Sequence, residues 1–166
     1  EIKNYKDAKG NPTIGYGHLI VGGVPYRDER KRWEDYLVGG GKKMSESEAD
    51  DLFEEDLINH SPKGPSYKKH SKGKDLPDDF LLTQNMFDAI IHWTFNAGVI
   101  NLRRSGIIDA LLEKDYIKAG RLIKIKNTTA GKAKVDLTSR RKKESAFFMS
   151  GYKEAMEKLK SSQSFS

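Results

Sequence analysis

A carboxylate and a hydroxyl stand on either side of a turn-forming segment near the start of this sequence. Asp7 precedes and Thr13 follows residues 8–12, AKGNP, which are rich in residues that favour turns. If the flanking residues pair as strands, the two side chains can lie across from each other on one face and hold a water molecule between them. In the alternative interpretation, Asp7 bonds to its own turn and Thr13 is an ordinary β-branched strand residue. These residues alone favour the alternative.

The sequence contains few other patterns typical of catalysis or ligand binding. Its four histidines form no His-Glu-x-x-His arrangement, and the absence of cysteine excludes disulfides, thiolate nucleophiles and thiolate metal sites. The GxSxG, P-loop and Rossmann patterns are also absent. We therefore expect no metal and no cofactor.

Hydrophobic spacing predicts that helices make up most of the chain after the hairpin. Ser45 and Glu48 have the spacing of a capping box, which predicts the start of a helix. The most apolar helix falls within residues 77–98 and should be the centre of the core, to which Phe147 and Phe148 are also expected to belong. Further helices are expected over residues 27–38, 102–112, 116–125, 137–150 and 152–159.

The composition is that of a globular protein with a basic balance. Of the 166 residues 36% are hydrophobic and 33% charged, and no stretch approaches the roughly 18 apolar residues of a membrane helix. The net charge of +6 favours an anionic partner, and nucleic acid and the bacterial cell wall both qualify. Residues 140–143, with Lys132 and Lys134, form the densest basic cluster. No recognition helix, stacking platform or zinc knuckle that would indicate nucleic-acid binding accompanies it.

Four segments, in order, resemble the phage-type lysozymes, the family of T-even-like muramidases and endolysins. In that family's hairpin an aspartate follows a tyrosine by two residues, a threonine follows six later, and I-G-x-G-H comes next; here these are Tyr5, Asp7, Thr13 and residues 14–18. The other segments are MSESEADDLFEEDL (44–57), LTQNMFDAIIHWTFNAG (82–98) and VDLTSRRKKESAFFMSG (135–151). Together they cover nearly the whole chain.

The resemblance implies a mostly helical α+β protein with a two-lobed, lysozyme-like fold. We expect a small β-hairpin lobe over about residues 1–58 and a larger helical lobe over about residues 77–160, with a frayed tail at 161–166. Between the lobes, prolines and glycines alternate with five lysines, which predicts a basic loop over about residues 59–76. These lysines form either a solvated loop or an electrostatic contact with the anionic wall.

The resemblance also implies a glycoside hydrolase with two catalytic carboxyl groups. Asp7 would be the ionised member, and Thr13 would help to hold the attacking water. The general-acid glutamate would lie at the third position before Glu1, outside the sequence given. Glu1 could replace it only if its carboxyl group were protonated, and a neighbouring α-amino group would hold that group ionised.

Further residues receive roles from the same resemblance. Leu19, Phe95 and Ser105 correspond to positions that line the saccharide cleft in this family. Each also has a simple structural explanation: Leu19 as strand core, Phe95 as helix core and Ser105 as a helix cap. His18 and Asp56 correspond to a structural ion pair that joins hairpin to helix. Glu144 is expected to pair with nearby arginines.

The function that follows is peptidoglycan hydrolysis at the β-1,4 bond between N-acetylmuramic acid and N-acetylglucosamine. The protein would reach the wall from the host cytoplasm at lysis, or be carried on the virion with other virion proteins as partners. No nucleic acid and no stable membrane association are expected. One alternative is a non-hydrolytic wall-binding or virion structural module that kept the fold, and a weaker one is a basic nucleic-acid-binding protein.

Overall fold

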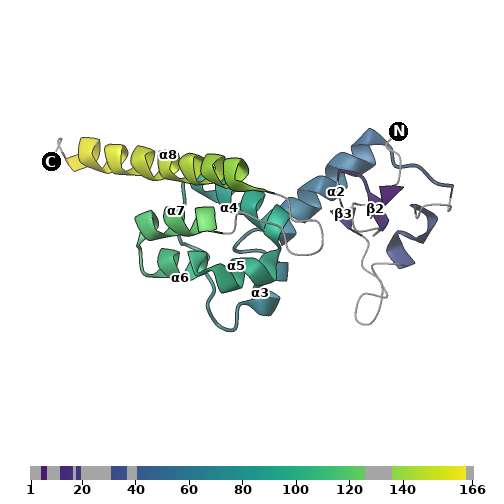
Figure 1. Cartoon of the computed structure of the whole chain (residues 1–166), viewed down its shortest axis with the longest axis horizontal. Helices are drawn as coiled ribbons and strands as arrows, with labels where there is room; N and C mark the ends of the chain where they lie inside the picture. The colour runs from purple at the N-terminus through teal and green to yellow at the C-terminus, as the bar shows by residue number, and fades with distance from the viewer. Residues whose placement is uncertain are drawn as a thin grey trace. The chain divides into compact units, whose positions relative to one another are not determined.

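The computed structural model describes residues 5–6, 12–16, 18–19, 31–36, 41–125 and 136–163. The chain divides into two compact units, Glu1–Ile58 and Asn59–Ser166, here called the hairpin unit and the helical unit (Figure 1). Glu1 and Asp7 lie outside the described residues. The α+β, mostly helical class expected from the sequence is confirmed.

The hairpin unit contains a three-stranded antiparallel sheet in the order β1-β2-β3. Strands β1 (Tyr5–Lys6) and β2 (Pro12–Ile14) form the expected hairpin, with Tyr5 opposite Thr13. Strand β3 (His18–Leu19) pairs back on β2, so that His18 is opposite Ile14. The turn between β2 and β3 uses Gly15 at φ +57°, a backbone conformation that L-residues rarely adopt.

The sheet is fixed to helix α2 (Glu46–Asn59) by a small apolar cluster. The cluster consists of Ile14, Trp33, Tyr36, Met44, Ala49 and Leu52. Of the helix expected over residues 27–38, the structure describes 31–36, which include the 3-10 helix η1 (Glu34–Tyr36). Gly15 lies close against this cluster, since a Cβ there would stand 3.2 Å from Met44 Sδ. The cluster therefore holds the hairpin on the helix.

The capping box predicted at the start of α2 is confirmed. Ser45 N donates to Glu48 Oε2 at 2.8 Å, and Glu48 N donates to Ser45 Oγ at 3.1 Å. Tyr36 Oη donates to the other carboxylate oxygen at 2.8 Å. These hydrogen bonds, with that from the Ser45 backbone first, hold the pKa of Glu48 below its ordinary value of 4.5.

We expect the stability that Glu48 contributes to depend on pH. Because its folded pKa is lowered, the contribution is present above the unfolded pKa and is lost as the pH falls through the folded one. Glu48→Gln keeps the cap but not the charge, so its Tm should lie below that of the wild type near neutral pH. That difference should shrink between about pH 5 and about pH 3. A difference in Tm that stays constant over this range would contradict the prediction.

The basic loop expected over residues 59–76 is wrong, because helix α3 (Pro65–His70) forms inside it. Proline is tolerated in the first turn of a helix, where its missing N–H has no partner to lose. Tyr67 is fully buried and donates its hydroxyl to the Lys74 carbonyl at 3.0 Å, and this burial raises its pKa to about 12. Lys63 Nζ donates to the Asp78 and Phe80 carbonyls, both at 2.8 Å. Tyr67 and Lys63 thus tie this segment into the helical unit.

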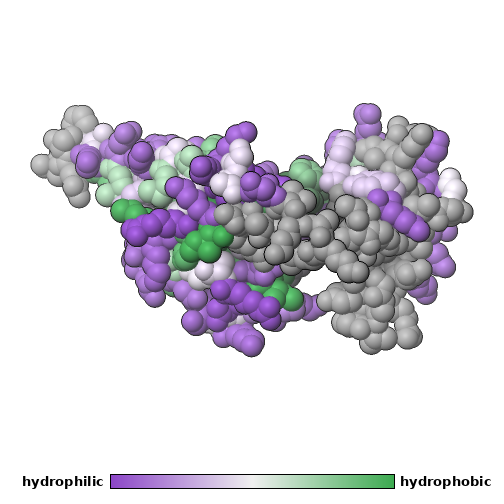
Figure 2. Space-filling model, in the orientation of Figure 1, coloured by the Kyte–Doolittle hydropathy of each residue, from purple (hydrophilic) through white to green (hydrophobic). Residues whose placement is uncertain are grey.

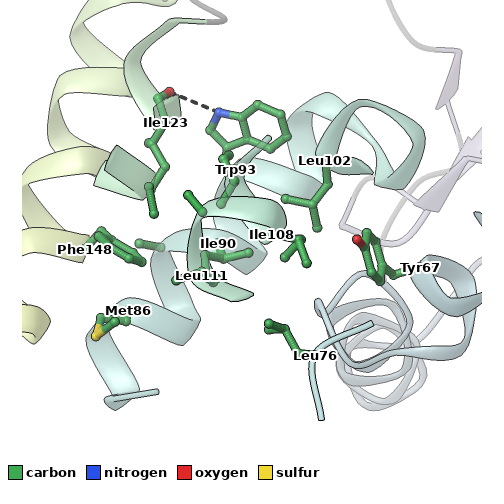
Figure 3. Packing of buried hydrophobic residues seen from close by; sticks show 14 residues of the cluster. Tyr67, Leu76, Met86, Ile90, Trp93, Leu102, Ile108, Leu111, Ile123 and Phe148 are labelled. Carbon is green, nitrogen blue, oxygen red and sulfur yellow. Dashed lines mark hydrogen bonds between the residues drawn. The ribbon is translucent and has the colours of Figure 1, made fainter. Parts of the chain in front are cut away.

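The core of the helical unit is centred on α4 (Gln84–Ala97), the apolar helix expected from the sequence. Figure 3 shows Trp93 of this helix among the buried side chains, with its Nε1 donating to the Ile123 carbonyl at 3.1 Å. Helix α7 (Tyr116–Ile125) has the predicted bounds. The single helix predicted over 102–112 is wrong: α5 (Val99–Ser105) and α6 (Ile107–Leu112) are separated by Gly106, which has φ +82°.

Two helices and a frayed tail were expected after residue 137, but the structure has one uninterrupted helix, α8 (Thr138–Gln163). Residues 164–166 of the expected tail lie outside the described residues. Helix α8 lies alongside α4 and α7 (Figure 1). Gly151 is buried within it, and a Cβ there would stand 2.9 Å from the Met86 backbone nitrogen and nearer still to Thr83 Oγ1. This glycine therefore allows close helix packing and does not end the helix. Phe148 is buried as expected, but Phe147 is 44% exposed, so that prediction was wrong.

The visible face of the helical unit is mainly hydrophilic, with separate hydrophobic spots (Figure 2). Within the described part of the chain, no helix is both long and apolar enough to cross a membrane. Nor do the described side chains include three or more His, Asp or Glu residues grouped as a metal site.

Candidate functional site

The hairpin places Thr13 in a buried position on its middle strand. Thr13 is 4% exposed and is paired through β2 with Tyr5 on one side and Leu19 on the other. Asp7 follows Tyr5 by two residues and lies outside the described residues, as does Glu1. Leu19 is described only as a strand residue. The described hairpin thus fixes the strand register around Thr13.

His18 and Asp56 lie together and connect β3 to α2. His18 Nδ1 is 2.9 Å from both carboxylate oxygens of Asp56, and the two side chains are only 14% and 8% exposed. The rings of His18 and Trp33 pack edge to face, with centroids 5.8 Å apart. Because the pair joins two elements across 38 residues of chain, it is arranged to hold the hairpin on the helix.

We expect Asp56→Asn to lower stability more than activity. The substitution removes the charged partner of a mostly buried pair, and breaking such a pair costs about 3 kcal/mol. Asp51→Asn, an exposed change in the same helix, is the matched control and should leave the Tm nearly unchanged. The measurements are Tm and the rate of wall lysis at a temperature where both variants are folded. A fall in lysis rate with no fall in Tm would refute a structural role.

Phe95 and Ser105 both lie in the helical unit but make different contacts. Phe95 is half-buried on α4 and packs on the His60 ring, with centroids 5.6 Å apart. Ser105 Oγ donates to the Leu102 carbonyl at 2.7 Å and accepts from Ile107 N at 3.1 Å, so it bridges the break between α5 and α6. It also borders a hollow of about 180 Å³ lined by Asn101, Arg104, Ser105, Leu122 and Ile125.

Glu144 belongs to a buried hydrogen-bond network with Arg141, which precedes it by three residues in the RRKKE segment. Arg141 Nη1 donates to the two Glu144 oxygens at 2.7 and 3.0 Å, and the two residues are 1% and 4% exposed. Arg141 Nη2 donates to Asn96 Oδ1 at 2.6 Å, which links α8 to the end of α4. His92 Nδ1 lies 3.6 Å from Glu144 Oε2.

The sequence pointed to the pairing of Glu144 with arginine but not to Asn96 or His92. Neither α4 residue carries a local signal for a contact with a helix more than 40 residues away. His92 and Glu144 also border a hollow of about 350 Å³, whose other lining residues are Asp88, Ala89, Lys143 and Phe147. Because both carboxylate oxygens of Glu144 accept hydrogen bonds from Arg141, its contacts are those of a structural residue.

Comparison with known proteins shows similarity over nearly the whole chain. A family model described as phage lysozyme matches residues 1–144. The fold is similar to a mutant of P22 lysozyme, with 26% identity, a TM-score of 0.60 and coverage of 90% of this chain and 87% of that one. It also resembles the endolysin from Escherichia coli O157:H7 phage FAHEc1 (24% identity, TM-score 0.59, 89% and 82% covered). A third similar structure is the muramidase domain of SpmX from Asticaccaulis excentricus (20% identity, TM-score 0.56, 88% and 84% covered). No curated protein sequence matches the chain.

Proposed function

This chain belongs to the phage lysozyme family and is a peptidoglycan-degrading muramidase, and from this premise we propose which bond it cuts and with which residues. The substrate bond is the β-1,4 linkage between N-acetylmuramic acid and N-acetylglucosamine. The observation that carries the proposal is the family match over residues 1–144, which includes the whole hairpin motif.

Asp7 is proposed as the ionised carboxylate of the reaction, with Thr13 helping to hold the attacking water. The register of β1 and β2 supports the placement of Thr13 in the hairpin, because Thr13 lies opposite Tyr5, and Asp7 follows Tyr5 by two residues in the sequence. The general acid would be a glutamate at the third position before Glu1, which is where the family pattern has it. A separation of roughly 6.5–9.5 Å between the two carboxyl groups would leave room for water and invert the anomeric carbon.

Leu19, Phe95 and Ser105 are proposed to contact the saccharide, while His18 and Asp56 support the hairpin. The half-buried ring of Phe95 offers an apolar surface for a sugar face. Ser105 borders an open hollow, although its hydroxyl is engaged within the helices. The protein is proposed to reach the wall from the host cytoplasm at lysis or as part of a virion.

The test is product analysis with the full-length protein, expressed with any residues that its gene encodes before Glu1. Purified peptidoglycan should be released as soluble fragments with new reducing ends at N-acetylmuramic acid, identified by mass spectrometry after borohydride reduction. New reducing ends at N-acetylglucosamine would refute the proposed bond. Firm binding to the wall with no release of fragments would instead support the non-hydrolytic alternative.

A further inference from the structure

The positive charge of this protein is concentrated in one of its two units. The helical unit contains 21 Lys and Arg against 11 Asp and Glu, whereas the hairpin unit contains 9 against 13. The net charge of +6 is therefore the sum of +10 on the helical unit and −4 on the hairpin unit. The proposed catalytic residues Asp7 and Thr13 both lie in the hairpin unit. None of the cations of the helical unit is among the proposed catalytic residues.

Helices α7 and α8 of the helical unit pack side by side and run in opposite directions. The rings of Tyr116 and Tyr152 stack with centroids 5.5 Å apart. One turn further along α7, the Gly120 carbonyl accepts a hydrogen bond from Ser145 Oγ at 2.7 Å. Residue numbers therefore rise along α7 while they fall along the facing part of α8, and the two helices share a seam.

Four exposed cations flank this seam. Arg121 and Lys124 follow Gly120 on α7, one and four residues later. On α8, Lys142 lies three residues before Ser145 and Lys153 follows Tyr152. Lys142 and Lys153 are 11 residues apart, which is close to three whole turns and puts them on the same side of α8. On each helix, these cations lie on the same rotational side of the residues that contact the other helix. Because the two helices are antiparallel, that side faces the same way on both of them. All four cations therefore border one surface, here called the basic seam.

The cations of the basic seam outnumber the carboxylates near them. Helix α7 contains no Asp or Glu, and the carboxylate of Glu144 on α8 is buried against Arg141. Two exposed carboxylates lie near the seam: Asp136, on which Lys142 acts electrostatically, and Glu157, one helical turn after Lys153. Within the described residues, no acidic side chain lies within ion-pair distance of Arg121, Lys124, Lys142 or Lys153. Cations left unpaired on a surface attract anionic polymers and raise their local concentration.

We propose that the basic seam binds the carboxylates of the stem peptides of peptidoglycan and so holds the enzyme on its substrate through residues other than the catalytic ones. This inference rests on the proposed function, because it takes its ligand from the same wall. Stem peptides carry free carboxylates at regular intervals along the glycan, and a row of separated cations suits such a polymer. Nucleic acid fits the seam less well, since Tyr116 and Tyr152 each use one ring face to stack on the other, which leaves less aromatic surface for bases.

The experiment measures binding and not catalysis. The full-length protein is mixed in the cold with sacculi from which phosphate polymers have been removed, and the fraction that sediments with them is measured. This bound fraction should fall as salt is added, because salt screens interactions between exposed charges. The double variant Lys124→Glu/Lys142→Glu should bind about tenfold more weakly at low salt. Both proteins should bind glycan strands poorly once an amidase has removed the stem peptides.

The matched control is Lys31→Glu/Lys69→Glu, which makes the same charge change at two exposed lysines that are not part of the seam. It should bind nearly as well as the wild type, and equal losses in the two double variants would overturn the proposal. Undiminished binding to peptide-free glycan would also overturn it, as would binding to DNA or anionic lipid vesicles alone. Wall cleavage is assayed separately, so failure of the proposed function would appear as absent cleavage whatever the binding result.

Discussion

Asp7→Asn is expected to reduce wall lysis by the full-length protein at least a hundredfold, in line with the roughly 10²–10⁴-fold contribution of a general base. An amide can neither accept the proton of the attacking water nor carry the negative charge that stabilises a sugar cation. The measurement is the initial rate of clearing of a suspension of purified walls, at equal concentrations of folded protein.

The matched control for this change is Asp51→Asn, the same substitution at an exposed position of α2 in the same unit. It should lyse walls at the wild-type rate. The Tm of Asp7→Asn should stay near that of the wild type, since a turn-flanking residue contributes little to the core. If Asp7→Asn retains lytic activity, Asp7 has no place in the mechanism.

Glu144→Gln is expected to cause the largest loss of stability in the helical unit. It leaves the buried Arg141 guanidinium without its charged partner, and removing one member of a buried pair costs about 3–5 kcal/mol. For a chain of this size each kcal/mol lowers the Tm by about 2–4 °C, so the expected fall is roughly 6–20 °C. Thermal unfolding followed by circular dichroism measures it.

Glu154→Gln is the control on the same helix. Glu154 pairs with Lys158 at 3.0 Å, but these side chains are 50% and 76% exposed, so the pair contributes less than about 1 kcal/mol. If the two substitutions lower the Tm equally, burial does not distinguish the pairs and the interpretation of Glu144 fails. Asn96→Ala should show an intermediate loss, because it removes only the hydrogen bond from Arg141 to α4.

Where the signal was local, the sequence was sufficient to predict the structure. Ser45 and Glu48 form the predicted capping box because the motif involves only neighbouring residues. The bounds of α7 follow from apolar spacing alone. The hairpin itself could be predicted from its turn-forming segment, but its register could not, since Tyr5 and not Asp7 lies opposite Thr13.

Where packing between distant segments decided the outcome, the sequence misled. A glycine inside a helical pattern resembles an end, and only contact with α4 shows why Gly151 belongs to the middle of α8. Phe147 and Phe148 are equivalent as hydrophobic residues, but the helix turns one inward and leaves the other 44% exposed. Of the candidate site, the roles of Thr13, Phe95 and Ser105 came from family resemblance, and the structure adds their burial and contacts. Asp7 remains a prediction from sequence.

The contact at Gly151 has a consequence for attempts to make this enzyme more heat-stable. Replacing glycine by alanine inside a helix ordinarily gains up to about 1 kcal/mol, so a propensity-based redesign would select both Gly120 and Gly151. At Gly120 the added methyl group would meet the side chain of Met149, with Sδ 2.6 Å away, and a flexible thioether can move aside. At Gly151 it would meet the backbone of Met86 at 2.9 Å, which cannot move without displacing α4. The same substitution is thus a candidate improvement at one glycine and a defect at the other, and a library for thermostability should keep Gly151 fixed.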